Sequence, residues 1–396
     1  MIRARSWWRV LLAVLVAHLL MVSLDPSPAA FGQACEQPSS DGCPLVPGQM
    51  VGAALATPDE IHTWRLQIPA GRGLRVRLSG LAVDYDLYVQ APDGQMVAAS
   101  QNEGRVDEIA DIPSTAGGDY RLYVQANPSR GVSSERPYLL TVQWTELFVL
   151  RGHDGPVRTV AYSADGGLLA TGGEDGSVRL WDTVEGAARA TLTGHTGPVT
   201  FVRFSPAESI LASASTDRTI RLWRPADGSV LRALGPHEGG VSRLSFSADG
   251  AVLSAGTTEK TVVEWRVSDG SQVRRIDKRV LGIEMSGRSP DGSLMAEGSD
   301  VGTTRVWRVA DGGGVQVLAG HQGAVRSTTF SPDGLLVATG GVDRTVRVWR
   351  AADGDPIQTF YGHTKAVTAV RFSPDGGALA SASEDGTARI WVAPGR

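Results

Sequence analysis

Apolar and polar residues alternate along several short stretches of the region 61–144. The clearest alternation is LRVRL at residues 74–78, which is the pattern of a strand with one buried face. Similar short runs recur at 85–89, 120–124 and 138–144. Several short antiparallel strands over this length predict a small β-sandwich.

From residue 145 onwards the chain repeats one unit every 42 residues. A tryptophan marks each unit, and these stand at Trp181, Trp223, Trp265, Trp307, Trp349 and Trp391. A His stands 28 residues before five of the six, and a Ser or Thr and an Asp stand ten and six residues before four of them. A period of about 40–45 residues with one Trp per unit is typical of four-stranded propeller blades.

These regularly spaced positions resemble the WD40 family over residues 146–396. In that family the His, the Ser or Thr, the Asp and the Trp form a buried hydrogen-bonded chain within each blade, and the resemblance implies the same chain here. Four repeats hold the complete set: His153, Thr171, Asp175 and Trp181; His195, Ser213, Asp217 and Trp223; His321, Thr339, Asp343 and Trp349; His363, Ser381, Asp385 and Trp391. The third repeat is partial.

The fourth repeat keeps only Trp307 of this set, with Arg279 in the His position and Arg288 in place of an aromatic residue. Because it lacks the hydrogen-bonding set and an aromatic anchor, it is predicted to be the least stable blade. The alternative interpretation is that this blade departs from the common pattern because it contacts a ligand.

The last repeat lacks an outer strand of its own, since the chain ends shortly after Trp391. The segment LFVLRGH at 147–153 aligns with RATLTGH at 189–195, the outer strand before the next His. It is therefore predicted to pair with the last blade and to remove an exposed sheet edge. A seventh blade would need about 42 further residues, and the N-terminal region lacks the His and Trp positions. The predicted fold is all-β: a six-bladed WD40-type β-propeller preceded by a small jelly-roll-like β-sandwich.

The N-terminal sequences DYDLYVQAPDGQMVAAS at 84–100 and GGDYRLYVQ at 117–125 resemble the bacterial pre-peptidase C-terminal domain. The resemblance implies a jelly-roll-like module of secreted proteins that aids export or binds a surface polymer. Asp84, Asp86 and Asp93 allow a calcium interpretation. A hairpin turn at Asp93 and a solvated strand face explain them better, so no metal site is predicted.

The first residues have the pattern of a targeting signal, since Arg3, Arg5 and Arg9 precede an apolar run over 10–24. An uncleaved anchor, or a lipid on Cys35, is the alternative. The predicted domains are a signal peptide at 1–34, a Pro-rich linker at 35–58, the sandwich at 59–144 and the propeller at 145–396. An exported location (periplasmic, extracellular or cell-envelope) follows, and there Cys35 and Cys43 form a candidate disulfide.

Charge and motifs argue against several classes of function. The net charge is −4, so no basic field attracts nucleic acid or anionic lipid, and membrane contact is expected only through the N-terminal anchor or lipid. No phosphate-binding loop and no Cys/His zinc spacing is present. Recurrent Ser/Thr-His-Asp sets imitate a hydrolase triad, but catalysis needs one set, not four. The sequence therefore predicts a non-enzymatic protein with no catalytic, cofactor or metal site.

Binding is expected on the propeller face that holds the loops before the inner strands and between the second and third strands. The candidate residues on this face are Arg158, Glu174, Thr200, Glu284, Asp300, Arg326, Thr368 and Glu384. They include two Arg and no aromatic residue, which indicates a polar, rather flat surface. The predicted function is an exported scaffold that binds a protein or a surface polymer. The alternative is an accessory component of an envelope enzyme or polysaccharide system, with the sandwich binding polymer.

Overall fold

The computed structural model describes residues 43–45, 50–53, 61–68, 72–79, 81, 85–101, 107–112, 118–126, 138–259, 261–277 and 287–394. All regular elements in these residues are β-strands, which confirms the predicted all-β class. No helix in the described part of the chain is long and apolar enough to cross a membrane. The predicted signal peptide and Cys35 lie outside the described residues, so the targeting signal and the candidate disulfide with Cys43 stay predictions.

Contacts divide the chain into two units. The first comprises 1–68, 75–112 and 118–143, and the second comprises 69–74, 113–117 and 144–396. In the first unit, one sheet has the strand order β1-β3-β8-β5-β6. Its strands are β1 (Cys43–Leu45), β3 (Ile61–Ile68), β5 (Tyr85–Gln90), β6 (Met96–Ser100) and β8 (Gly118–Ala126).

A second group of strands is built on the long strand β9 (Tyr138–Arg151). In this group β2 (Met50–Ala53) and β4 (Gly73–Ser79) pair with β9, and β7 (Glu108–Ile112) pairs with β4. The alternation seen in the sequence is an alternation of burial, because Val76 and Leu78 are buried whereas Arg77 between them is exposed. Apolar residues of both groups, such as Leu87 and Leu140, have no exposed surface and form the core.

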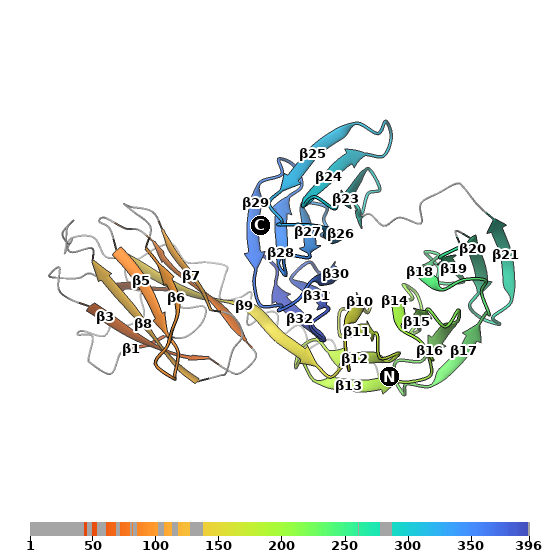
Figure 1. Cartoon of the computed structure of the whole chain (residues 1–396), viewed down its shortest axis with the longest axis horizontal. Coiled ribbons are helices and arrows are strands. Elements are labelled where there is room, and N and C mark those ends of the chain that lie inside the picture. Colours follow the sequence, from red (N-terminus) through yellow and green to blue (C-terminus); the bar gives the residue numbers. More distant parts are fainter. Residues whose placement is uncertain are drawn as a thin grey trace, which may run out of the picture. The chain divides into compact units, whose positions relative to one another are not determined.

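The second unit consists of antiparallel sheets whose strands pair in chain order (Figure 1). The first sheet contains β10 (Val157–Tyr162), β11 (Leu168–Gly173), β12 (Val178–Asp182) and β13 (Ala188–Leu192), and the second contains β14 (Val199–Phe204), β15 (Leu211–Ser215), β16 (Ile220–Trp223) and β17 (Val230–Leu234). The third contains β18 (Val241–Phe246), β19 (Val252–Thr257), β20 (Thr261–Arg266) and β21 (Gln272–Asp277). We call the first strand of each repeat its inner strand.

The fourth sheet contains β22 (Gly287–Arg288), β23 (Leu294–Gly298), β24 (Thr303–Arg308) and β25 (Gly314–Ala319). The fifth contains β26 (Val325–Phe330), β27 (Leu336–Gly341), β28 (Val346–Arg350) and β29 (Pro356–Phe360), and the last repeat contributes β30 (Val367–Phe372), β31 (Ala378–Ser383) and β32 (Thr387–Val392). Arg279 and Glu284 of the fourth repeat lie outside the described residues.

The last repeat obtains its fourth strand from the segment before the first repeat, as the sequence predicts. β32 pairs antiparallel with β9, with Thr387 opposite Arg151 and Trp391 opposite Glu146. Arg389 donates to Glu146 across this pair at 2.7 Å, and their side chains are only 5% and 1% exposed. The predicted closing strand at 147–153 is confirmed in its pairing from Glu146 to Arg151, whereas Gly152 and His153 follow the end of β9.

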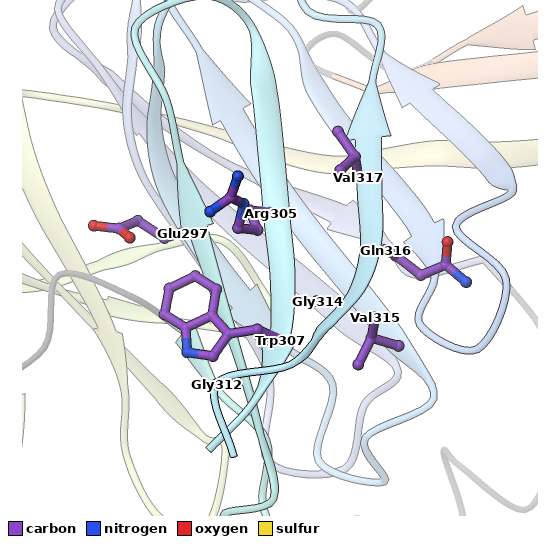
Figure 2. Close-up of a pocket in the computed structure, with 8 residues that line it drawn as sticks. All are labelled: Glu297, Arg305, Trp307, Gly312, Gly314, Val315, Gln316 and Val317. Carbon is purple, nitrogen blue, oxygen red and sulfur yellow. The ribbon is translucent and has the colours of Figure 1, made fainter. Parts of the chain in front are cut away.

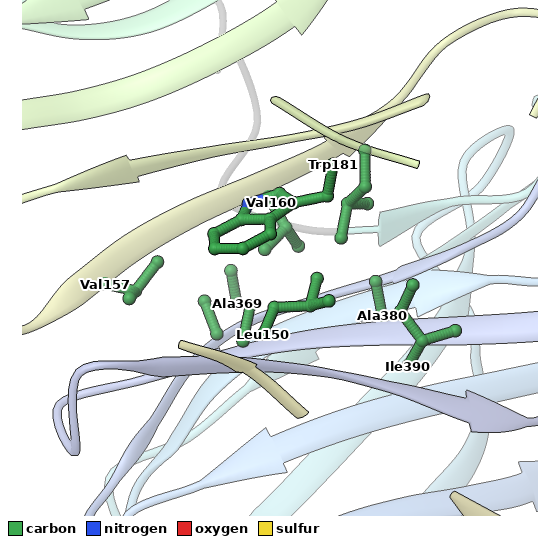
Figure 3. Packing of buried hydrophobic residues seen from close by; sticks show 10 residues of the cluster. Leu150, Val157, Val160, Trp181, Ala369, Ala380 and Ile390 are labelled. Carbon is green, nitrogen blue, oxygen red and sulfur yellow. The ribbon is translucent and has the colours of Figure 1, made fainter. Parts of the chain in front are cut away.

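Apolar side chains from the first and last repeats form one core where these repeats meet (Figure 3). Leu150 of the closing strand packs there with Ile390 of β32 and with Trp181 of the first repeat. Trp223, Trp349 and Trp391 take the same place against the repeats that precede them. Each of these tryptophans thus joins one sheet to its neighbour, because an indole buries a large apolar area at the contact.

One repeating position shows where this packing fails. The outer-strand residues Leu150, Leu192, Leu234, Leu318 and Phe360 are at most 4% exposed. Ile276 of the third repeat occupies the same position and is 41% exposed. At the other junctions, the Trp of the following repeat packs against this outer-strand residue. The corresponding Trp307 of the fourth repeat is half-buried. The junction between the third and fourth repeats therefore lacks the packing of the others among the described residues.

Candidate functional site

The four complete repeats contain the predicted hydrogen-bonded chain. In the second repeat Trp223 Nε1 donates to Ser213 Oγ at 2.7 Å, and His195 contacts the same hydroxyl through Nε2 at 2.7 Å. His195 Nδ1 lies 2.8 Å from the carboxylate of Asp217. The first, fifth and sixth repeats repeat these contacts around His153, His321 and His363. Two strands and two loops of each sheet are thereby tied together.

The chemistry of the groups fixes the direction of this chain. An indole N–H can only donate, so the hydroxyl of Ser213 accepts from Trp223 and gives its own proton to Nε2 of His195. The other ring nitrogen, Nδ1, then carries a proton and donates to Asp217. Burial lowers the pKa of His195, which favours this neutral form. The pKa of Asp217 is lowered to about 2 by hydrogen bonds from Thr219, His195 and backbone amides, against the opposing effect of burial.

Each complete repeat has a further member that the sequence analysis missed. A Ser or Thr two residues after the Asp donates to its carboxylate: Ser177 at 2.8 Å, Thr219 at 2.7 Å, Thr345 at 2.8 Å and Thr387 at 2.6 Å. The backbone N–H of the residue after the His also donates to the same carboxylate. The sequence could have revealed this member, because a Ser or Thr recurs two residues after the Asp in all four complete repeats.

The glycine before the His has a steric role in these repeats. A Cβ on Gly194 would lie 2.9 Å from Nη1 of Arg221, and the backbone there has φ +155°. The same close approach joins Gly152 to Arg179 and Gly362 to Arg389. In the third repeat Val263 stands in place of the Arg, and Trp265 Nε1 donates directly to His237 at 3.2 Å because Ala255 offers no hydroxyl.

The hydroxyl groups of the hydrogen-bonded sets are buried and cannot contact a substrate. Thr171, Ser213, Thr339 and Ser381 are 0% exposed, so no ligand reaches the atom that a hydrolase would use as its nucleophile. In the described residues no group of three or more His, Cys, Asp or Glu side chains is arranged to hold a metal ion. The chain of contacts satisfies buried polar groups and aligns strands, which is a structural task.

Three of the predicted face residues form one charged cluster. Arg158 Nε donates to Glu174 at 3.0 Å, and its Nη1 lies 3.6 Å from Glu384 of the last repeat. About a third of each side chain is exposed, at 37%, 37% and 35% for Arg158, Glu174 and Glu384. The cluster spans the junction between first and last repeats on the predicted face. We call it the Arg158 cluster.

The other predicted face residues are not brought together in the same way. Thr200 and Thr368 use their hydroxyls to donate to backbone carbonyls of the next repeat, at Val241 and, at 2.6 Å, Val157. Asp300 and Arg326 are exposed, and neighbouring backbone links them, since Val325 N donates to Ser299 O at 2.9 Å. Glu284 lies outside the described residues.

A cavity of about 290 Å³ adjoins the Arg158 cluster. Its lining includes Glu384 of the cluster, the exposed Lys365, and the glycines Gly155 and Gly386. A Cβ on Gly386, where φ is +83°, would lie 3.2 Å from the carbonyl oxygen of Gly155. The small residues thus let the backbones of the last and first repeats approach and leave polar groups open around the cavity.

A larger cavity, about 710 Å³, lies on the sheet of the fourth repeat (Figure 2). Glu297 stands directly opposite Arg305 in the register of β23 and β24, and Trp307 lies on the same wall. Glu297 occupies the position where complete repeats have the buried Ser or Thr, and it is exposed. The cavity is therefore open where the other repeats are filled by packing.

Comparison with known proteins identifies the repeats. Five segments match the family model described as WD domain, G-beta repeat: 144–182, 186–224, 228–266, 312–350 and 354–392. These matches pass over 267–311, the stretch with the fourth repeat, where most of the hydrogen-bonding set is missing. The chain therefore carries WD40 repeats, and its four-stranded sheets are those of a WD40 β-propeller.

Curated relatives share short parts of the chain. Periodic tryptophan protein 2 homolog of Dictyostelium discoideum is 48% identical over 56 residues, which is 13% of this chain and 6% of that protein. Serine-threonine kinase receptor-associated protein of Homo sapiens is 54% identical over 41 residues, 10% of this chain and 12% of that protein. Meiotic recombination protein rec14 of Schizosaccharomyces pombe is 30% identical over 109 residues, 24% of this chain and 36% of that protein. The chain thus matches well under two thirds of each relative.

These relatives overturn two predictions. They are eukaryotic WD-repeat proteins whose names refer to receptor association and meiotic recombination, not to export or to polysaccharide systems. The predicted exported scaffold, its envelope-system alternative and its periplasmic, extracellular or cell-envelope location are therefore wrong. The predictions relied on an apolar run after basic residues, a compositional signal that does not by itself define a destination. No family match covers the region compared with the pre-peptidase C-terminal domain.

Proposed function

We propose that the chain is a non-catalytic protein-interaction platform that binds its partner at the Arg158 cluster. The single observation that carries this proposal is the exposed ion pairing of Arg158 with Glu174 and Glu384 across two repeats. Propeller repeats form a rigid frame, and surface charges on such a frame select a partner of complementary charge. The closed hydroxyls of the repeats support a non-enzymatic role.

Six blades are part of this proposal. Five four-stranded sheets and the group β30-β31-β32-β9 account for six units at the 42-residue spacing of the tryptophans. We further propose that the N-terminal unit is an accessory β-sandwich, as its two groups of strands and shared core support. The resemblance to the pre-peptidase C-terminal domain implies a jelly-roll-like fold for this unit, and we propose no partner for it.

Affinity capture with the full chain tests the binding face. The variant Arg158→Ala, combined with Glu384→Ala, removes the cluster and should reduce recovery of a specific protein partner by tenfold or more, about 1.4 kcal/mol. The matched control is Arg189→Ala, which breaks an exposed ion pair with Asp182 on the outer strand. Captured proteins are then compared by quantitative mass spectrometry.

The two variants separate the possible outcomes. If the cluster variant no longer captures one partner and Arg189→Ala still captures it fully, the result supports the Arg158 cluster as the binding site. Equal recovery by both variants rules out the Arg158 cluster as the binding site. Turnover of a substrate by the purified chain would instead contradict the non-catalytic role. Thermal unfolding of each variant shows that recovery is compared between folded proteins.

A further inference from the structure

Two arginines occupy the same repeating position on inner strands that flank one common neighbour. Arg203 lies on β14 and Arg371 on β30, and both strands pack against β10. The equivalent residue of β10 is Ala161, which is 7% exposed and packs in the core between the first and second sheets. The inner wall formed by β14, β10 and β30 therefore carries an arginine at this position on β14 and on β30 and a small, buried residue between them.

The described residues supply no counter-charge to this pair. Within the described part of the chain neither Arg203 nor Arg371 forms an ion pair, and the hydrogen bond of Arg371 goes to the carbonyl of the adjacent Val370 at 2.7 Å. Asp375 follows β30, but its carboxylate already accepts from Ser373 Oγ and Gly377 N. Two like charges held without an acid partner repel each other and lose hydration, which is unfavourable unless an anion joins them.

The protein environment around the pair confirms this cost. Burial, together with the nearby charge of Arg203, lowers the pKa of Arg371 to about 10. Burial also lowers the pKa of Arg203, although its surface remains open to water.

The remaining residues at this position suit an oxyanion. Four repeats have small side chains there, namely Ala161, Ser245, Gly287 and Thr329. None of these four side chains carries a charge, so no carboxylate stands at this position to repel an anion. Arginine presents a planar fork of N–H donors that matches the oxygens of a phosphoryl group.

We propose that Arg203 and Arg371 together hold an oxyanion of the size of phosphate on this inner wall. The two guanidinium groups contact its oxygens from opposite sides of Ala161, and the bound charge relieves the repulsion between them. This site is separate from the Arg158 cluster and does not depend on the function proposed for it. Its ligand class is a phosphoryl group or an equivalent tetrahedral oxyanion.

Inorganic phosphate tests the site directly. Isothermal titration calorimetry and thermal unfolding of the full chain are followed at rising phosphate, with chloride adjusted to keep ionic strength constant. Phosphate should raise the melting temperature of the natural chain, because a ligand that binds only the folded state stabilises it. Arg203→Gln and Arg371→Gln should each weaken binding by about tenfold to a hundredfold, since each removes hydrogen bonds to a charged group.

Arg326→Gln is the matched control, because Arg326 is an exposed arginine on another inner strand. It should bind phosphate as the natural chain does. Without phosphate, both site variants should melt no lower than the natural chain, since repulsion has been removed. The proposal is overturned if phosphate does not raise the melting temperature, if all three variants respond alike, or if acetate at the same ionic strength stabilises the chain equally.

Discussion

The second and fourth repeats have the same length and strand order but differ in what holds them together. In the second, Trp223 is 1% exposed and its indole belongs to a chain of hydrogen bonds that ends at Asp217. In the fourth, Trp307 is half-buried and faces a cavity of about 710 Å³ beside Glu297. Strand pairing is present in both repeats, so the hydrogen-bonded chain is needed for packing between sheets rather than for forming a sheet.

This difference teaches which part of the repeat is dispensable. Backbone pairing among β23, β24 and β25 persists although Glu297 replaces the buried Ser or Thr to which the Trp of a complete repeat donates. What is lost is the cover over the neighbouring repeat, where Ile276 is 41% exposed. A degenerate repeat in a propeller therefore preserves the count of strands and opens a surface. The lower stability of this blade, and ligand contact as its alternative, stay predictions.

The largest expected contrast is between the tryptophans themselves. Trp223→Ala should lower the free energy of unfolding by about 3–5 kcal/mol, because it empties a filled core position. Trp307→Ala should lower it by about 1 kcal/mol, because its side chain is already partly in water. Denaturant unfolding followed by circular dichroism measures both. Equal losses would show that the fourth repeat is packed as tightly as the second.

The buried ion pair of the closing strand comes next. Glu146→Ala should cost about 3 kcal/mol, because it leaves Arg389 buried without this carboxylate. The equivalent residues of the fourth repeat are Gly314 and the exposed Arg305, and Arg305→Ala should change stability by less than about 0.5 kcal/mol. Chemical denaturation compares the two variants, and a large effect at Arg305 would remove the distinction drawn between these repeats.

A smaller effect is expected at the central hydroxyl of a complete repeat. Thr339→Val keeps the shape but leaves Trp349 Nε1 and His321 Nε2 without their partner, at a cost of about 1–3 kcal/mol. Glu297→Ala at the equivalent position of the fourth repeat should be within about 0.5 kcal/mol of neutral. The urea unfolding midpoints of both variants are measured in parallel. If Thr339→Val leaves the midpoint unchanged, the hydrogen bonds among Trp, Thr and His add nothing to stability.

The smallest expected effect of a single residue is the pH dependence that each buried His gives to the free energy of unfolding. Burial lowers the folded-state pKa of His195, His321 and His363 below the ordinary value of 6.5. Below that pH the unfolded chain binds protons that the folded chain does not, so stability is full above about pH 6.5 and falls as the pH decreases. Asp217, with a pKa of about 2, adds a further loss between about pH 4 and pH 2.

Urea unfolding at pH 8, 6.5 and 5 measures this dependence. Each unit by which a His pKa is lowered corresponds to about 1.4 kcal/mol, so the complete repeats should dominate the slope. His195→Gln should flatten the curve, whereas a substitution in the fourth repeat, which has no His at this position, should leave it unchanged. Stability that rises on acidification would contradict the assignment of neutral histidines.

The sequence predicted most of the frame because the frame is periodic. The 42-residue spacing placed the His, hydroxyl, Asp and Trp of each complete repeat, and the alignment of 147–153 with 189–195 anticipated the pairing of β9 with β32. Side chains that act across repeats were harder to foresee. Thr200 and Thr368 donate to a neighbouring backbone, and Arg158 joins Glu384 more than two hundred residues away. Such contacts depend on which repeats become neighbours, and no local pattern records that.

The closing strand also constrains the order in which the propeller can be completed. β9 lies at the start of the repeat region, and its partner β32 lies at the end, so that Glu146 and Arg389 are 243 residues apart in the chain. During synthesis β9 emerges long before the strand that will pair with it, whereas the intervening sheets can form from local hairpins. Pairing at such separation closes a very long loop and is slow. The final sheet is therefore expected to form last, after translation has passed β32.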